Sequence, residues 1–285
     1  MKGCGVGTMS DQVEKFGNSV IQHGTANDRA YVMKIDPQDY PQIVDYVVAL
    51  AETKGYSKIF VKSPSFARSG FLEKGFVEEA KIPNLFRGED EGYFFSRFLC
   101  EPRRTEQQSK LVAEILQTAE KKPVVTGEPA LPEGCHFSTM RKQDTEDMAE
   151  LYKAVFASYP FPIHDPAYLV QTMDENLIYF GIRRGDELIA LSSAEIDFEG
   201  QNAEMTDFAT LPECRGLGLA TFLLEQMEGG VGKIGIKTAY TIARSYSFGM
   251  NLTFAKHGYI FSGTLVNNTQ ISGDLESMNV WYKPL

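Results

Sequence analysis

The hydrophobic and polar positions in the second half of the chain alternate between strand-like and helix-like spacing. Alternating apolar positions predict strands over residues 135–141, 176–184, 188–197, 203–210, 232–245, 259–270 and 277–285. Helical spacing predicts helices over residues 145–157, 167–173, 219–228 and 247–258, the third of them ended by Gly229 and Gly230. This order predicts an α/β protein with a mixed sheet (α+β) over residues 135–285.

The pattern changes near the middle of the chain. Residues 101–122 are strongly polar, with one helical apolar stripe through Leu111 and Ile115. Residues 123–134 then carry three prolines and two glycines, a composition typical of a linker. We therefore expect an N-terminal extension, an N-terminal α/β domain, a linker and a catalytic domain, at residues 1–28, 29–120, 121–134 and 135–285 respectively.

Composition argues against several classes of protein. A net charge of −10 does not fit nucleic-acid binding, which needs a basic surface, but is compatible with a small cationic substrate. The sequence has no apolar run of ~18 residues for a membrane span, and its start lacks the apolar centre of a signal peptide. The four cysteines and four histidines are dispersed, which argues against a metal site or disulfides and suits a reducing cytoplasm.

The most informative stretch is residues 211–228, LPECRGLGLATFLLEQME. A predicted strand, a short turn and a helix start follow one another here, so several backbone N–H groups and the positive end of a helix dipole point outward. Gly216 and Gly218 leave room for phosphate oxygens to approach the backbone. The stretch therefore predicts an anion site suited to a pyrophosphate.

The spacing Arg215-x-x-Gly218-x-Ala220 resembles the R/Q-x-x-G-x-G/A motif of the GNAT (GCN5-related N-acetyltransferase) family. The dinucleotide fingerprint fails at Thr221, and no Walker sequence occurs. The resemblance implies the GNAT fold, acetyl-CoA as co-substrate and no metal. It implies cofactor contacts from Phe208, Ala209, Thr210, Arg215, Gly216, Leu217, Gly218, Leu219, Ala220, Thr221 and Ser247.

Residues 243–259 and 263–283, together with residues 59–64 and 71–76, resemble the β-lysine N-acetyltransferases. That resemblance spans nearly the whole chain. It implies acetylation of the ε-amine of β-lysine to the compatible solute Nε-acetyl-β-lysine in the cytoplasm. Two alternatives stay open: a GNAT enzyme for another small amine (a polyamine, an aminoglycoside or an amino acid) and a non-catalytic acyl-CoA sensor. The oligomeric state, a homodimer included, is also open.

Short segments of the N-terminal part have counterparts in the C-terminal part. Residues 58–62 parallel residues 233–237, and both are followed by Ala-Arg-Ser and then by Lys-Gly-Phe or His-Gly-Tyr. The N-terminal part is thus either a degenerate half of the same fold or a helper domain of unrelated origin. Its helix over residues 41–55 follows Asp39-Tyr40-Pro41 with no glycine turn, so we do not expect it to hold CoA.

Amine acetylation needs a base, because an ε-ammonium with a pKa of ~10.4 must lose a proton before it attacks a thioester. Glu204 lies on the strand before the loop, at the position of the general base in related enzymes if the turn is two residues shorter here. Asp207 is the second candidate, expected on the opposite face by strand alternation.

The general acid is less clear. Many GNAT enzymes protonate the leaving thiolate with a tyrosine, and alignment on Lys256-His257-Gly258-Tyr259 places Phe254 at that position. The usual asparagine is replaced by Ser247. Tyr246 is a nearby substitute, but CoA thiolate leaves readily enough that an acid is not required.

Substrate recognition is expected near the C-terminus. A bidentate arginine suits a carboxylate, and Arg244 ends a predicted strand. A polar cluster in the terminal hairpin supplies the other candidates: Asn267, Asn268, Glu276 and Asn279.

Overall fold

The computed structural model describes residues 11–125, 127, 129–271 and 273–285. The strands are β1 (Gln12–Phe16), β2 (Ser19–Gly24), β3 (Arg29–Lys34), β4 (Lys58–Pro64), β5 (Val77–Phe86), β6 (Asp90–Phe98), β7 (Cys135–Thr139), β8 (Leu177–Arg184), β9 (Glu187–Asp197), β10 (Asn202–Thr210), β11 (Thr238–Arg244), β12 (Ile260–Ile271) and β13 (Asp274–Pro284). The helices are α1 (Gln42–Lys54), α2 (Arg68–Glu73), α3 (Glu101–Arg104), α4 (Ser109–Glu120), α5 (Thr145–Val155), α6 (Pro166–Glu175), α7 (Leu219–Lys233) and α8 (Phe248–Lys256).

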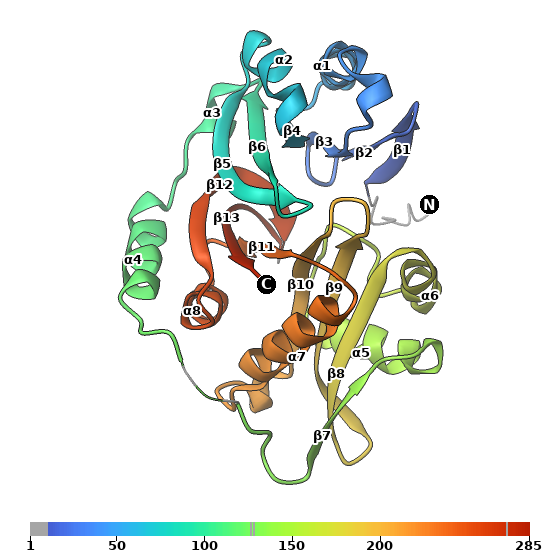
Figure 1. Cartoon of the computed structure of the whole chain (residues 1–285), viewed down its shortest axis with the longest axis vertical. Helices are drawn as coiled ribbons and strands as arrows, with labels where there is room; N and C mark the ends of the chain where they lie inside the picture. The colour runs from blue at the N-terminus through green and yellow to red at the C-terminus, as the bar shows by residue number, and fades with distance from the viewer. Residues whose placement is uncertain (1–10, 126, 128, 272) are drawn as a thin grey trace, which may run out of the picture.

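All of these strands belong to one sheet, in the order β1-β2-β3-β4-β6-β5-β12-β13-β11-β10-β9-β8-β7 (Figure 1). The N-terminal half of the sheet ends at β5, and the C-terminal half begins at β12. The two strands pair where Gly263 faces Ala80. A Cβ at Gly263 would lie 2.0 Å from the Glu79 carbonyl oxygen, so only glycine allows this close approach.

The two halves place their strands in the same order. Read from the outer edge, β1-β2-β3-β4-β6-β5 corresponds to β8-β9-β10-β11-β13-β12, and β7 has no N-terminal equivalent. Both halves contain one parallel pair, β3 with β4 and β10 with β11. In each half a helix crosses between the strands of the parallel pair: α1 in the first and α7 in the second.

The turn that ends α2 in the first half and the turn that ends α8 in the second have the same geometry. The N–H of Phe76 donates to the Phe71 carbonyl, and the N–H of Tyr259 donates to the Phe254 carbonyl, both at 3.1 Å. The glycine before each donor has a left-handed φ, 78° in the first half and 81° in the second, as this helix-ending motif requires. The two rings of each turn pack edge to face.

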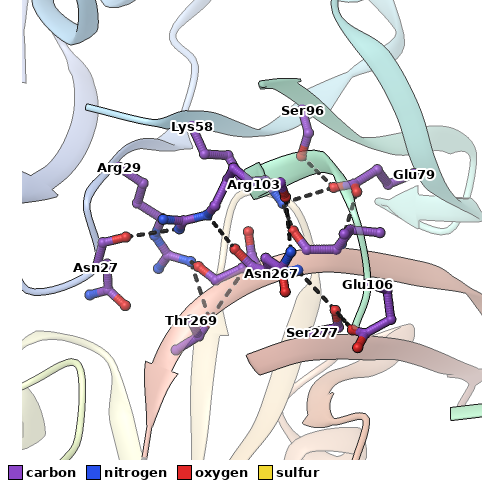
Figure 2. Close-up of polar contacts among 12 residues, drawn as sticks. Asn27, Arg29, Lys58, Glu79, Ser96, Arg103, Glu106, Asn267, Thr269 and Ser277 are labelled. Carbon is purple, nitrogen blue, oxygen red and sulfur yellow. Dashed lines mark hydrogen bonds and ion pairs between the residues drawn. The ribbon is translucent and has the colours of Figure 1, made fainter. Parts of the chain in front are cut away.

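A buried polar network joins the halves (Figure 2). The register of β12 against β13 shifts between Leu265 and Thr269, and this bulge exposes three successive carbonyls. They are the carbonyls of residues 266, 267 and 268. Lys58 donates to the first at 2.7 Å, Arg103 to the second at 2.7 Å and Arg29 to the third at 2.5 Å. The N-terminal half therefore satisfies the backbone of the C-terminal half.

The mixed α/β fold and every predicted element of the second half are confirmed, with two corrections to their bounds. α7 does not end at Gly229 and Gly230 but continues to Lys233, because its apolar side chains, including Val231, remain buried. The strand predicted from residue 232 begins at Thr238, after that helix and a short turn.

The sequence echoes between the halves correspond only in part. Residues 58–62 lie in β4, whereas residues 233–237 lie at the end of α7 and in the turn before β11. The Lys-Gly-Phe and His-Gly-Tyr steps do occupy the same place in both halves. Within the described residues, no helix is long and apolar enough to cross a membrane.

Candidate functional site

The loop before α7 forms an open cradle of backbone donors. Gly216 and Gly218 have left-handed φ angles of 82° and 76°, and a Cβ at either would meet nothing within 4 Å. No described group accepts a hydrogen bond from the backbone N–H groups of residues 216–221. Unpaired backbone donors at the start of a 15-residue helix have the arrangement that suits phosphate oxygens.

β10 and β11 separate next to this cradle. Their parallel pairing covers only residues 202–204 against residues 238–240, although both strands continue well beyond it. On its other side, β10 stays paired with β9 through Ala209 and Thr210. Among the described strands, none pairs with the edge of residues 208–210 that faces β11, so this edge has backbone groups available for an extended ligand.

A cavity of about 1060 Å³ is lined by residues of both strands around the point of separation, among them Glu204 and Thr206 of β10 and Tyr240 and Ile242 of β11. Both halves of the sheet line it. The N-terminal half contributes basic and aromatic residues, including Arg29, Tyr31, Phe60 and Lys62; the C-terminal half contributes acidic residues and tyrosines, including Tyr159, Glu195, Glu204, Asp207 and Tyr240.

Glu204 occupies the last paired position of β10 before it parts from β11. It lies directly opposite Glu195 of the neighbouring strand β9. Burial, together with the negative charge of Glu195, raises the pKa of Glu204 to about 8, while Lys62 and a hydrogen bond from Tyr240 oppose the rise. Burial raises the pKa of Glu195 as well. Two carboxyl groups that resist ionisation together line one wall of the cavity.

Asp207 also lines this cavity, which corrects the expectation that it would face the opposite side. Its φ of 54° and a register shift between Thr206 and Ala209 form a bulge that breaks strand alternation. The Asp207 carboxylate accepts hydrogen bonds from Tyr159 and, at 2.5 Å, from Ser193. With its oxygens occupied in this way, Asp207 is held in place and is less suited than Glu204 to take a proton.

The model of the "Acetyltransferase (GNAT) family" matches residues 146–259. A β-lysine N(6)-acetyltransferase of Methanococcus maripaludis is 38% identical over 273 residues, covering 96% of this chain and 98% of the relative. The chain belongs to the GNAT family. N-acetyltransferase YodP of Bacillus subtilis is 35% identical, with 94% of this chain and 96% of the relative covered. A β-lysine N(6)-acetyltransferase of Methanosarcina mazei is 29% identical, with 86% and 98% covered.

GNAT enzymes use acetyl-CoA, and the cradle and the unpaired edge of β10 have the geometry to hold its pyrophosphate and its extended arm. Ser247 has a structural role beside this site: its hydroxyl caps α8 by accepting from the Met250 N–H at 3.3 Å. No group of three or more histidine, cysteine or acidic side chains gathers as a metal site in the part of the chain that the structure describes.

The candidates for a general acid lie outside the cavity lining. Tyr246 donates to Glu106 at 2.7 Å, and burial together with this bond raises its pKa. Phe254 is fully buried and packs edge to face on Phe208, 5.7 Å away between ring centroids. A hydroxyl at Phe254 would therefore lie close to the backbone edge expected to hold the cofactor arm.

The structure does not bring the substrate candidates together, because most of them contact other parts of the protein. Arg244 forms a bidentate ion pair with Glu276, at 2.9 and 2.5 Å, so its guanidinium is already occupied. Asn267 donates to the carbonyls of residues 103 and 105, and Asn279 donates to Asn251. Of the five candidates, only Asn268 lines the cavity.

Most residues of the cavity were not among the sequence candidates, and those with the most evident chemistry are Arg29, Lys62, Tyr159 and Glu195. Strand β9 gave a signal for Glu195, since a glutamate between Ala194 and Ile196 in a mostly buried strand is unusual. Nothing local to β3 or β4 indicates that Arg29 and Lys62 face the catalytic half.

Proposed function

We propose that the protein transfers the acetyl group of acetyl-CoA to the ε-amine of β-lysine and releases Nε-acetyl-β-lysine. Two relatives that carry this activity in their names align over nearly their whole length. The product would be a zwitterion without net charge, as suits a compatible solute, so we further propose a role in osmotic adaptation inside the cell. β-Lysine would come from a mutase acting on lysine.

One observation carries the proposal: Glu204 lines the cavity where β10 and β11 separate, with a pKa raised to about 8. A base with a pKa near the working pH is efficient at removing a proton. The substrate enters as an ε-ammonium, and the Glu204 carboxylate takes its proton. The neutral amine can then attack a thioester carbonyl placed at the gap between the strands. The acidic wall also attracts a diamine before reaction.

The residues of the cradle would hold the cofactor. Backbone N–H groups of residues 216–221 bind the pyrophosphate, and residues 208–210 pair with the arm that leads to the gap. When bound, acetyl-CoA supplies an activated acyl group with a thiolate leaving group. That thiolate has a pKa near the ~8.5 of free cysteine, so it leaves without a dedicated acid.

We also propose that the N-terminal half is a degenerate GNAT-like half, and that residues 135–285 form the catalytic domain. The shared strand order and the shared helix-ending turn support this. The N-terminal half has no glycine loop before α1, so a single cofactor site per chain is expected.

The test is steady-state thiol release with acetyl-CoA and a panel of amines, with the product identified by NMR. We expect β-lysine to have a higher kcat/KM than lysine, spermidine or an aminoglycoside, and the acetyl group to appear on the ε-nitrogen. Faster turnover of another amine would move the protein to that substrate. CoA binding without thiol release for any amine would make it an acyl-CoA sensor.

A further inference from the structure

Arg29 is a buried cation on the cavity wall. It lies at the start of β3, lines the cavity and is only 4% exposed. No carboxylate of the described residues comes within ion-pair distance of it, and its Nε has no hydrogen-bond partner among them. A guanidinium held out of water without a counter-ion is costly, and burial lowers its pKa to about 10.

The other two cations of the bulge differ from Arg29 (Figure 2). Lys58 pairs with Glu79 at 3.1 Å, and Arg103 uses all three of its nitrogens on protein acceptors. Neither of them lines the cavity. Support of the bulge therefore explains Lys58 and Arg103 completely. Arg29 donates through Nη1 to the Asn268 carbonyl and Thr269 and through Nη2 to Gln22, so its Nε is the nitrogen left without a partner among the described residues.

Asn268 supplies an unused acceptor beside Arg29. The backbone carbonyl oxygen of Asn268 accepts a hydrogen bond from Arg29 Nη1 at 2.5 Å, so the two residues are in direct contact. Its side chain is 1% exposed and lines the cavity, and its Oδ1 has no partner among the described residues. An unpaired donor and an unpaired acceptor thus lie together at one end of the cavity.

The basic residues that line the cavity all come from the N-terminal half, and most of the acidic ones come from the C-terminal half. Its basic lining near the base comes from the N-terminal half, with Arg29 on β3 and Lys62 on β4. Lys62 donates to Tyr240 at 3.1 Å and forms no ion pair within the described chain. The buried carboxyl groups beside Glu204 are Glu195 and Asp207 of the C-terminal half, while Asp36, Glu89 and Asp90 of the N-terminal half also line the cavity. A ligand with a carboxylate at one end and an ammonium at the other would have a preferred direction here.

We infer that Arg29 binds the carboxylate of the substrate and that Asn268 Oδ1 accepts a hydrogen bond from its β-ammonium. This inference rests on the proposed function. In β-lysine one methylene separates the carboxylate from the carbon that bears the β-amine, and the ε-amine lies at the far end. Binding the first two groups beside β3 directs the ε-amine towards Glu204 and keeps the β-amine away from it. The N-terminal half therefore determines which amine is acetylated.

The experiment compares β-lysine with 1,4-diaminopentane, the same molecule without its carboxylate. In the wild type we expect kcat/KM to be about 100-fold higher for β-lysine, since a charge-assisted pair is lost with the carboxylate. Arg29→Gln should lower kcat/KM for β-lysine by a similar factor, mainly through KM, and leave 1,4-diaminopentane within about 3-fold.

Arg103→Gln is the matched control, because Arg103 supports the neighbouring carbonyl of the same bulge without lining the cavity. Arg103→Gln should change kcat/KM for β-lysine and for 1,4-diaminopentane by the same factor. If Arg29→Gln does not fold, Arg29→Lys keeps the charge and a donor for the Asn268 carbonyl, and the same ratio is measured against Arg103→Lys.

Equal losses on both substrates in the Arg29 variant, or no preference for β-lysine in the wild type, would overturn the inference and leave the proposed function standing. A wild type that does not acetylate β-lysine at all would overturn the proposed function, and this inference with it.

Discussion

The two halves of the sheet have the same strand order but different chemistry at the matching turn. In the C-terminal half, β10 leads into a glycine loop whose backbone donors are free. In the N-terminal half, β3 leads through Asp39, Tyr40 and Pro41 into α1. Proline has no N–H, and Asp39 already accepts from the backbone N–H groups of residues 18 and 19. A carboxylate of the protein itself therefore occupies the region of the N-terminal turn, where an anion would be repelled.

The matching strand positions differ in the same sense. Glu204 faces Tyr240 across the parallel pair of the C-terminal half, and Tyr31 faces Phe60 across that of the N-terminal half. One half thus presents a titratable carboxyl group and the other an aromatic ring. The N-terminal half thus shares the strand order of the C-terminal half but has neither the glycine cradle nor a carboxyl group at the position of Glu204. What it contributes to the cavity is Arg29 and Lys62.

The largest effect is expected from Gly218→Asp. A carboxylate in the cradle opposes the pyrophosphate, so the KM for acetyl-CoA should rise by about 100-fold or more while that for the amine changes little. Gly185→Asp is the matched control, because Gly185 also has a left-handed φ and open space but lies in the β8–β9 turn. Steady-state kinetics decide the matter. A folded Gly218→Asp with unchanged affinity for CoA would remove the loop from the cofactor site.

Glu204→Gln tests the base. Activity at neutral pH should fall by about 100-fold or more, because the amide keeps the shape but takes no proton. In the wild type, kcat/KM should rise with pH through about 8, as the Glu204 carboxyl ionises. In the variant this rise of kcat/KM around pH 8 should be absent, and activity should recover only as free amine accumulates near its own pKa of ~10.4. A normal pH profile would transfer the role to Asp207 or to solvent.

Lys62→Gln tests whether the N-terminal half tunes the base of the other half. Lys62 lowers the pKa of Glu204, so loss of this cation should raise that pKa further. The limb of the profile should then move to higher pH by about one unit, with up to about 10-fold less activity at pH 7. Lys34→Gln is the control, since Lys34 pairs with the exposed Glu199. If kcat/KM of Lys62→Gln rose at the same pH as in the wild type, Lys62 of the N-terminal half would not tune the pKa of Glu204.

The sequence predicts well those parts of the site that are local in the chain. The cradle needs a strand, two glycines and a helix start within a few residues, and all of them are visible in residues 203–228. The order of elements follows from periodicity in the same way. The equivalence of the halves is only hinted at, because the echo at residues 233–237 lies outside the matching strand while the glycine turns coincide.

The rest depends on pairing between distant segments. Arg29 and Lys62 reach the cavity only because the sheet continues from β5 into β12. Arg244 pairs with Glu276 because of the register of β11 on β13 and of β13 on β12, which places Glu276 within reach. The bulge that turns Asp207 towards the cavity contains no glycine or proline, so the sequence gives no local signal for it. Such features require the three-dimensional partner of each strand, which spacing alone does not give.

The smallest effect is expected from Phe254→Tyr, which restores the tyrosine common in the family. If protonation of the thiolate limited the rate, this change would speed turnover. We expect kcat to stay within about 3-fold, because the thiolate is a good leaving group, and the free energy of unfolding to fall by about 1–3 kcal/mol, since a buried hydroxyl needs a partner. Phe71→Tyr is the matched control: Phe71 occupies the same place in the N-terminal turn and is equally buried. Thermal melts should show similar losses for both variants. A rise in kcat confined to Phe254→Tyr would mean that an acid does limit the reaction and that the catalytic half has lost one.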